Sequence, residues 1–579
     1  MTTAAVLQID PHDDLIVALS DLNAGETVDW PAPQSEIRNQ SAIRNPKSAI
    51  ATSAIATSAI GTSAILKSSI PAKHKFAAHD IHAGQRLRMY GVTVAEAVTD
   101  IAAGERITTD NVRAATDQVD RKARRVQWQP PDATRWQDVT FDGYRRGDGR
   151  VGTANNWLVV PLVFCENRNI EKLRDALLDE LGYGHAESYR AQTRQLLDLM
   201  TAGRSPDQIA AATLGAAAPT DRNRTFPNVD GISFLTHNIG CGGTRDDALM
   251  LCRLIAAYID HPNVAGATVL SLGCQNAQVS LMQQRLAELN PSFDKPLHIF
   301  EQQQQASESE MLSEAIRHTF TGLMQANHYR RQPTPLCHLT LAVECGGSDG
   351  FSGITANPAL GHCADLLCAL GGTVILSEFP ELSGAETDLV SRCVDDRVAE
   401  RFLQLMQDYA SRAEAIGSGF RENPSPGNIA DGLITDPMKS LGAAKKGGTS
   451  PIVDVLDYTE IATRPGLNLL CTPGGDLESV TAMVGSGATV VCFTTGLGTP
   501  TGNAVAPVLK ISSNTDIATR LPDMIDFNAG GIIDAKDTIE SAGQRLLDLV
   551  IETASGRFTP AANKLGQDDW LPWKRGVSL

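Results

Sequence analysis

The stretch LTLAVECGGSDGFSG, residues 339–353, contains the pattern that decides the fold. The mostly apolar residues 339–345 are followed at once by a loop of glycine and polar residues. The same arrangement recurs along the chain, with helical patterns between its copies, for example at 246–260 and 308–327. Short, nearly continuous apolar strands separated by long amphipathic helices predict an α/β fold of parallel sheets covered on both faces. Further strand candidates lie at 157–165, 267–274, 373–379, 467–472, 489–494 and 508–513.

A different pattern occupies the N-terminal region. The similar segments DLNAGE, DIHAGQ and DIAAGE begin at Asp21, Asp80 and Asp100, and each follows an alternating apolar stretch. The Ala-Gly pair in each segment supplies the residue that a tight turn between strands requires, so we expect a small all-β module. Between the first two copies, SAI recurs at short intervals from Ser41 to Ile70. This low-complexity composition predicts an inserted flexible loop.

The chain is too long for one hydrophobic core, because it has 579 residues. A polar, proline-containing stretch after the β-module predicts a linker. The polar segment RRQPTP, which begins at Arg330, interrupts the α/β pattern and marks a further boundary. We therefore expect a β-module at 1–116 with its insert at about 36–70, a linker at 117–136, a middle α/β domain at 137–330 and a C-terminal α/β domain at 331–579.

Composition argues against several classes of function. The formal net charge of −17 disfavours a nucleic-acid partner, since phosphate binding needs clustered Lys and Arg. The N-terminus lacks a cationic start followed by an apolar stretch, and no apolar run is long enough to cross a membrane. We therefore expect neither a signal peptide nor a membrane partner. The 11 cysteines are odd in number and scattered, which favours free thiols in a reducing cytoplasm over a disulfide framework.

Four loops at the ends of predicted strands combine glycine with side chains that carry chemistry. Sites on open parallel sheets lie beyond the carboxyl ends of the strands, and thiolate, imidazole and carboxylate bind divalent transition metals. His237 and Cys241 are four residues apart in one loop, which is compatible with a shared metal. No Cys pair has a diagnostic spacing, so thiols simply packed in the sheet are the alternative. The loops are residues 165–167, 236–243, 273–276 and 345–353.

The C-terminal third places amines and carboxylates in similar positions. Lys439 and Lys445 lie in Gly-rich surroundings and suit a substrate carboxylate, or a base if desolvated; solvated lysines are the alternative. Glu378 lies at the end of the predicted strand 373–379 and suits a base or a ligand, with a surface cap as the alternative. The segment GLGTPTG, 496–502, approximates a dinucleotide fingerprint, but it leads to a strand and not to a helix. We therefore expect no NAD.

Six strings in these regions resemble the altronate/galactarate dehydratase family, and the N-terminal module resembles the SAF-type β-clip domain of that family. The similarity runs in order over roughly residues 137–530. The strings are FDGYRRGDGRVGTANNW (141–157), HNIGCGG (237–243), CGGSDGFSGITANPALG (345–361), NPSPGN (423–428), KSLGAAKKGG (439–448) and TTGLGTPTG (494–502).

The resemblance implies a β-clip, a middle domain that contributes to a homodimer, and a C-terminal Rossmann variant. It also implies β-elimination of water from an aldonate or aldarate, aided by a divalent metal, Fe²⁺ or alternatively Mn²⁺. From the chemistry of the residues, we expect Lys439 or Glu378 to be the base and His237 or a metal-bound water to be the acid. The resemblance and the residue chemistry together give three sets of candidates. The catalytic candidates are Lys439, His237, Glu378 and Asp349, and the candidate metal ligands are His237, Cys241, Cys274 and Cys345. The substrate-binding candidates are Ser348, Asn357, Asn428, Lys445, Asn167 and His74.

Two departures from the family pattern leave alternatives open. The β-module has Thr108-Thr-Asp-Asn111 where a His-rich string is expected, which leaves His74 as its best candidate. Leu497 stands where the family pattern has an Arg, and an Arg would bind a carboxylate with two hydrogen bonds. The alternatives are a lyase acting on another hydroxy acid, such as sulfolactate, or a sensor without catalysis. A further variant replaces the single ion by an iron–sulfur cluster on Cys241, Cys274 and Cys345.

Overall fold

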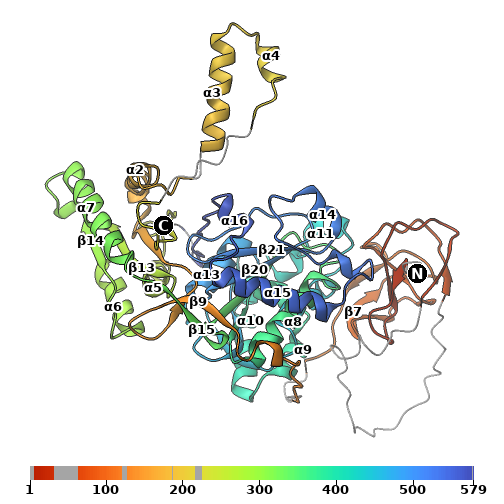
Figure 1. Cartoon of the computed structure of the whole chain (residues 1–579). Helices are drawn as coiled ribbons and strands as arrows, with labels where there is room; N and C mark the ends of the chain where they lie inside the picture. Colours follow the sequence, from red (N-terminus) through yellow and green to blue (C-terminus); the bar gives the residue numbers. More distant parts are fainter. Residues whose placement is uncertain are drawn as a thin grey trace. The chain divides into compact units, whose positions relative to one another are not determined.

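The computed structural model describes residues 5–30, 63–119, 127–184, 187–215, 224–576 and 578, which divide into two compact units (Figure 1). The first unit contains Met1–Phe141, Pro333–Thr501 and Pro507–Ala561. The second contains Asp142–Gln332, Gly502–Ala506 and Ala562–Leu579. Two segments expected in the C-terminal domain, 502–506 and 562–579, thus belong to the unit built on the middle domain. No helix of the described ranges is both long and apolar enough to cross a membrane.

The N-terminal part of the first unit is a module of short antiparallel strands, as predicted. Strand β4 (Ser63–Ile65) pairs with β3 (Thr27–Asp29), so the predicted insert ends before Ser63 and not at Ile70. Its residues 31–62 lie outside the described part of the chain. The other strands are β1 (Val6–Leu7), β2 (Leu15–Ala18), β5 (Lys75–Ala77), β6 (Arg86–Met89), β7 (Val92–Ala97) and β8 (Val112–Ala114).

The rest of the first unit is built on a seven-stranded sheet of order β18-β19-β17-β16-β20-β21-β22, in which every pair of neighbours is parallel. All residues of β17 and β20 are buried, so both faces of the sheet are covered. The strands are β16 (Thr340–Cys345), β17 (Thr373–Leu376), β18 (Ile452–Leu456), β19 (Gly466–Leu470), β20 (Val490–Thr495), β21 (Val508–Ser512) and β22 (Phe527–Asn528).

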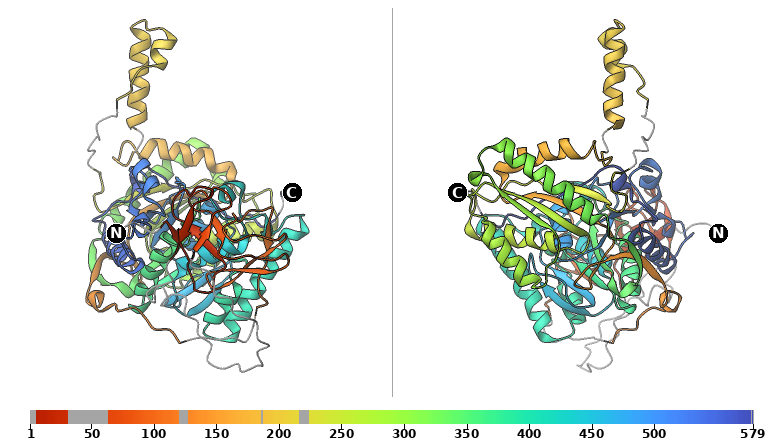
Figure 2. Two further views of the ribbon diagram at one scale, coloured as in Figure 1. Left: turned by 90° about the vertical axis from the view of Figure 1, so that its right-hand side faces the viewer. Right: turned by 60° about the vertical axis from the view of Figure 1, so that its left-hand side comes forward.

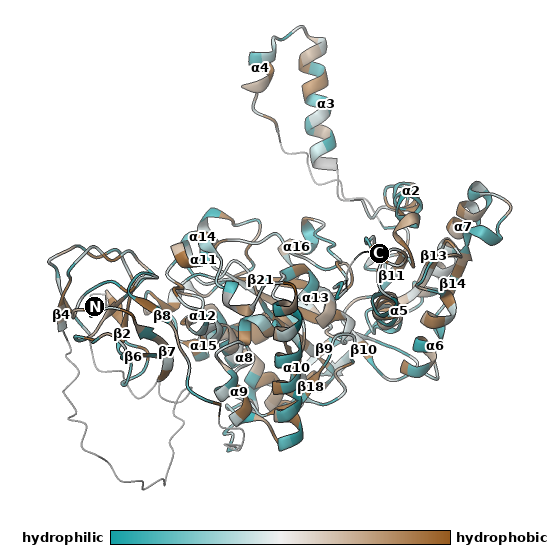
Figure 3. Ribbon diagram, turned by 180° about the vertical axis from the view of Figure 1, so that it is seen from behind, coloured by the Kyte–Doolittle hydropathy of each residue, from teal (hydrophilic) through white to brown (hydrophobic). Residues whose placement is uncertain are grey.

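Helices cover this sheet with their apolar sides. Helix α10 buries Val398, Phe402 and Met406 while its other side is polar (Figure 3). Helices α8 and α15 pack against each other and both contact β20. The helices of this region are α8 (Ala356–Ala369), α9 (Glu386–Arg392), α10 (Asp396–Ala415), α11 (Pro426–Ala430), α12 (Asp436–Ala444), α13 (Asp476–Gly485), α14 (Thr515–Arg520) and α15 (Ile539–Ala554).

The strand order places a topological switch point at β16. From β16 the chain continues to β17 on one side, and β20 later pairs with β16 on the other side. Ligands of open α/β sheets bind at such a point, beyond the carboxyl ends of the strands. The loops after Cys345 and Thr495 meet there, because these residues end the two strands.

The second unit has a four-stranded parallel sheet of order β12-β11-β13-β14. A small sheet has the order β10-β9-β15, and both β9 and β15 contain a boundary between the units. Helices α2 and α7 pack together against the parallel sheet, and α5 and α6 form another pair (Figure 2). The confirmed fold class is therefore α/β with an N-terminal β-module. The unit's elements are β9 (Thr140–Arg145), β10 (Val151–Gly152), β11 (Asn156–Pro161), β12 (Gly231–Phe234), β13 (Val264–Ser271), β14 (Leu297–Glu301), β15 (Arg331–Pro335), α2 (Asn167–Leu177), α3 (Glu187–Thr201), α4 (Pro206–Ala210), α5 (Arg245–Asp260), α6 (Val279–Leu289), α7 (Glu308–Ala326) and α16 (Ala561–Lys564).

Candidate active site

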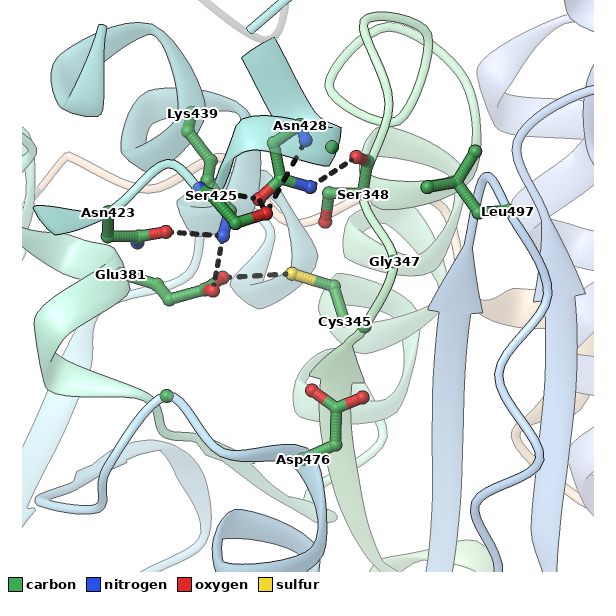
Figure 4. A pocket seen from close by; sticks show the side chains of 13 residues that line it. Cys345, Gly347, Ser348, Glu381, Asn423, Ser425, Asn428, Lys439, Asp476 and Leu497 are labelled. Carbon is green, nitrogen blue, oxygen red and sulfur yellow. Dashed lines mark hydrogen bonds and ion pairs between the residues drawn. The ribbon is translucent and has the colours of Figure 1, made fainter. Parts of the chain in front are cut away.

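A pocket of about 310 Å³ lies at the switch point of the seven-stranded sheet (Figure 4). Its floor begins where β16 ends, at Cys345-Gly346-Gly347. A side chain at Gly346 would place its Cβ 2.1 Å from a carboxylate oxygen of Asp476, and Gly347 has a left-handed φ of 61°. The two glycines therefore let the backbone turn close to Asp476. The lining residues are Cys345, Gly346, Gly347, Ser348, Glu381, Asn423, Ser425, Gly427, Asn428, Lys439, Gly474, Asp476 and Leu497.

Lys439 provides the positive charge of the pocket. Helix α12 carries it, and its Nζ lies 2.6 Å from Glu381 Oε1 and 2.7 Å from Asn423 Oδ1. Burial alone would lower the pKa of Lys439, but the facing carboxylate of Glu381 and the nearby Cys345 and Glu378 raise it above its usual value. The amine therefore stays an ammonium, which suits an anionic ligand better than it suits a base.

Asp476 is a carboxylate of the pocket whose pKa is raised. It begins helix α13 and faces the Cys345 loop. Burial, and next the negative charge of Glu381, raise the pKa of Asp476 to about 6. A carboxylate with a pKa near neutrality is suited to exchange protons with a substrate.

A buried charged layer lies directly behind the pocket. Lys446 Nζ donates to Cys345 Sγ at 2.9 Å and forms an ion pair with Glu378. Glu378 is fully buried and has a left-handed φ of 65°, which is rare for a residue other than glycine. Burial raises the pKa of Glu378 to about 7, although Lys446 acts to lower it. Such strain is retained where the surroundings hold it, most often at functional sites.

This layer and the pocket contain two sets of groups that fit a divalent cation. Cys345, Glu378 and Glu381 form one set, and Glu344, Glu378 and Asp476 form the other; within each, the ligand atoms lie within 4.8 Å of one another. The Oε1 atoms of Glu344 and Glu378 are buried without a hydrogen-bond partner among the described residues. A cation there would satisfy these oxygens and compensate the excess negative charge. The donor set therefore fits the predicted divalent metal.

Ser348 and Asn428, two polar residues that are predicted to bind substrate, line the pocket. Ser425 caps helix α11, its Oγ accepting from the N–H of Asn428, and Asn428 Nδ2 donates to the carbonyl of Ser348 at 2.8 Å. Leu497, after β20, lines the pocket with an apolar side chain. The amide and hydroxyl groups here suit the hydroxyls of a ligand, while Leu497 offers no charge to a second carboxylate.

Two other predicted residues serve the loop architecture and do not line the pocket. Asp349 is fully buried and accepts hydrogen bonds from Ser352 Oγ and Ser513 Oγ, both at 2.8 Å. Asn357 Nδ2 donates to the carbonyl of Gly442 at 3.0 Å, and Asn357 Oδ1 accepts from a threonine of β20. These contacts give both residues a structural role, while the catalytic role of Asp349 and the substrate-binding role of Asn357 stay predictions.

The remaining candidates of the first unit also lie outside the lining. Lys445 Nζ stands 6.0 Å from the centroid of the Tyr90 ring. His74 Nε2 pairs with the carbonyl of Ala430 at 3.0 Å, and Arg106 contacts His74 Nδ1 at 2.9 Å. His74 thus joins the β-module to the residue that ends α11, and Lys445 lies near a tyrosine of the same module. Their contacts with substrate stay predictions.

The second unit contains the other predicted residues. The backbone N–H of Ile239 donates to His237 Nδ1 at 3.2 Å, so His237 Nε2 carries the proton that it gives to the carbonyl of Pro161 at 2.8 Å. Burial lowers the pKa of His237 to about 4, so it is a neutral residue that shapes its loop. Its roles as metal ligand and acid stay predictions, and the contacts of the described structure give it a place in the loop architecture. Asn167 Nδ2 donates to the carbonyl of His237 at 2.7 Å and shares in that loop architecture.

The predicted set of metal ligands is divided between the units. Cys345 belongs to the first unit, while Cys241 and Cys274 belong to the second, where both are exposed. The site also contains residues that the sequence did not single out, namely Asp476, Asn423, Lys446 and Glu344. Asp476 follows strand β19 through a Gly-rich loop, so the rule that pointed to the other loops applies to it as well.

Comparison with known proteins gives matches along most of the chain. Three family models match: the Altronate/galactarate dehydratase SAF domain at residues 4–115, the D-galactarate dehydratase/Altronate hydrolase second domain at 143–327, and the D-galactarate/Altronate dehydratase C-terminal domain at 336–578. Altronate dehydratase of Escherichia coli K12 is 33% identical over 85% of this chain and 89% of its own. Galactarate dehydratase (L-threo-forming) of the same organism is 30% identical, over 86% and 88%. The (2R)-sulfolactate sulfo-lyase subunit beta of Chromohalobacter salexigens is 28% identical, over 73% and 94%.

Proposed function

Because the chain belongs to the altronate/galactarate dehydratase family and is a lyase, we propose that it dehydrates an aldonate or aldarate to a 2-keto-3-deoxy acid. The observation that carries this proposal is the pairing of an ammonium, Lys439, with a proton-accepting carboxylate, Asp476, in one pocket at the switch point. An anionic substrate in an acidic protein needs such a local positive charge. Removal of the proton on the carbon next to the substrate carboxylate requires a base close by.

In the proposed reaction, Lys439 holds the substrate carboxylate while the amides of Asn423 and Asn428 contact hydroxyls. Asp476 takes the proton from the carbon next to that carboxylate, and the electron pair of the C–H bond becomes a C=C bond. The neighbouring carbon loses its hydroxyl, to which Asp476 returns the proton, and water leaves. The resulting enol tautomerises to the keto acid. This assigns the base to Asp476, in place of Lys439 or Glu378, because Glu378 does not line the pocket.

The residues that would hold a divalent ion are Cys345, Glu378 and Glu381. Bound there, the ion supplies positive charge beside the substrate carboxylate, where negative charge accumulates as the proton leaves. One sulfur and several oxygens suit Fe²⁺, with Mn²⁺ as the alternative. The cytoplasm as the place of action and the homodimer stay predictions, which fractionation and sedimentation test.

The proposal is tested by product formation. Protein prepared without oxygen, with Fe²⁺ and reductant, is incubated with a panel of aldonates, aldarates and sulfolactate, and 2-keto-3-deoxy acid is measured. Metal-dependent product from one sugar acid supports the proposal. Folded, metal-loaded protein that forms no keto acid from any of them contradicts it.

A second candidate function is suggested by a relative of the chain, and Leu497 bears on the substrate. With an apolar side chain in the pocket where an Arg is expected, the second carboxylate of an aldarate lacks a charged partner. A similar protein is named a sulfolactate sulfo-lyase, so release of sulfite from sulfolactate is the alternative reaction. Sulfite production in the same panel distinguishes it from loss of water.

A further inference from the structure

Three cysteines lie at one edge of the parallel sheet of the second unit. Cys165 follows β11, Cys241 follows β12 and Cys274 follows β13, and both β12 and β13 pair in parallel with β11. The carboxyl ends of these neighbouring strands therefore meet at the same edge. We call Cys165, Cys241 and Cys274 the cysteine edge.

Hydrogen bonds fix the three loops to one another. The N–H of Phe164 donates to the carbonyl of Ile239 at 3.1 Å, which joins the first loop to the second. Asn276 Nδ2 donates to the carbonyl of Cys241 at 2.7 Å, and the N–H of Ala277 donates to the carbonyl of Gly240 at 3.0 Å. The second loop is thereby joined to the third. The neutral His237, with a hydrogen bond at each ring nitrogen, holds the start of this second loop.

The cysteine edge is exposed, which distinguishes it from most thiols of the chain. Six of the eleven cysteines are buried and four are exposed, and the cysteine edge accounts for three of those four. A free cysteine without a chemical role is usually buried as a small apolar side chain. Three exposed thiols gathered by three loops therefore point to a ligand.

Three helices begin close to the cysteine edge. Helices α2, α5 and α6 each begin within a few residues after one of the three cysteines. Their N-termini carry partial positive charge that stabilises thiolates once a metal has displaced the protons.

We propose that Cys165, Cys241 and Cys274 hold an iron–sulfur cluster of four irons and four sulfides. Each thiol releases its proton and its sulfur forms one bond to iron, so three irons have a protein ligand. The fourth iron keeps a position open for an oxygen ligand or for a solvent molecule. This replaces the set Cys241, Cys274 and Cys345 suggested by the sequence, since Cys345 is buried beside Lys446 in the first unit.

The spacing of the sulfurs favours a cluster over one ion. Among the described residues, the groups with all ligand atoms within 4.8 Å of one another do not include the cysteine edge. A single ion needs its ligands that close, whereas several irons bridged by sulfide reach thiolates that are further apart.

The test uses the full chain purified without oxygen and, in parallel, reconstituted with sulfide and equal amounts of ferrous and ferric iron. We expect a broad visible absorbance band that bleaches on reduction, with about four irons and four acid-labile sulfides per chain. Cys165→Ser, Cys241→Ser and Cys274→Ser should each lower iron and sulfide, while the exposed control Cys337→Ser should not. Cys345→Ser should keep the band even if it loses dehydration, which separates this proposal from the proposed function.

A second measurement does not depend on the folding of variants. In the native protein the three thiols should resist alkylation, and they should react as fast as Cys337 after the iron is removed by oxidation and chelation. Protein without sulfide, or with zinc or a single iron, overturns the proposal. So does native protein in which the cysteine edge is alkylated at the rate of Cys337.

Discussion

The pocket of the first unit and the cysteine edge of the second arise from the same structural device and differ in chemistry. Each lies where neighbouring parallel strands end in Gly-rich loops. In the pocket, Cys345 is buried among carboxylates, two of which form ion pairs with lysines. At the cysteine edge, three thiols are exposed and no ion pair joins their side chains to a cation in the described structure. A cysteine at the end of a strand therefore takes its function from the charges that surround it.

The largest expected effect concerns the proton-accepting carboxylate. Asp476→Asn should lower kcat by about 10²–10⁴-fold, because the amide cannot take a proton. With a pKa of about 6 in the protein, Asp476 should also make kcat/KM fall as the pH decreases below 6. The variant should lose that limb in a pH profile of keto-acid formation. An unchanged kcat, or an unchanged acid limb of the pH profile, would show that another residue is the base.

The next effect concerns the charge that holds the substrate. Lys439→Met should lower kcat/KM by about 10²–10³-fold while the metal content stays, because the buried ammonium is the partner of the substrate carboxylate. The matched control is Lys445→Met, since Lys445 packs near Tyr90 outside the pocket lining. Equal losses of kcat/KM in the two variants would contradict the assignment of Lys439 as the partner of the substrate carboxylate.

A smaller effect links the buried carboxylates to stability. Burial raises the pKa values of Glu378 and Asp476 above those of the unfolded chain. Without metal, the folded state therefore binds more protons, and its stability should fall as the pH rises towards about 7. Mn²⁺ should oppose this, with a gain of about 2.7 kcal/mol at roughly 100 Kd. Thermal unfolding should show a larger Mn²⁺ gain at pH 8 than at pH 5, and Glu378→Gln should diminish it. A pH-independent gain would contradict this site.

The smallest expected effect concerns specificity. Leu497→Arg should raise kcat/KM for aldarates over aldonates by about 10-fold, because only an aldarate has a second carboxylate for the Arg to bind. This is the lower end of the about 1.5–3 kcal/mol that a hydrogen bond to a charged group contributes. The ratio of the two kcat/KM values measures it, and an unchanged ratio would contradict a contact between residue 497 and the second carboxylate.

The sequence predicted the fold class, the family and the edge of the sheet where the pocket lies, because strand, glycine and polar loop follow one another locally. It could not predict which side chains face the pocket. Lys445 and Lys446 are adjacent, yet one packs near Tyr90 and the other contacts Cys345. His237 lies in a motif typical of ligands, but backbone groups occupy both of its nitrogens. Such differences depend on contacts between segments far apart in the chain.

The contact between the β-module and the turn after α11 has a consequence for synthesis on the ribosome. Lys73 Nζ lies 3.1 Å from Asp431, 358 residues further along the chain, and the buried Lys75 donates to the carbonyl of Gly432 at 2.7 Å. At about 5–20 residues per second, about 20–70 s separate the emergence of the two partners. Lys75 must stay hydrated during that interval, because its carbonyl partner does not yet exist. The module can therefore complete its burial only late in translation, and nascent chains stalled before residue 431 should leave Lys75 open to amine-reactive labels.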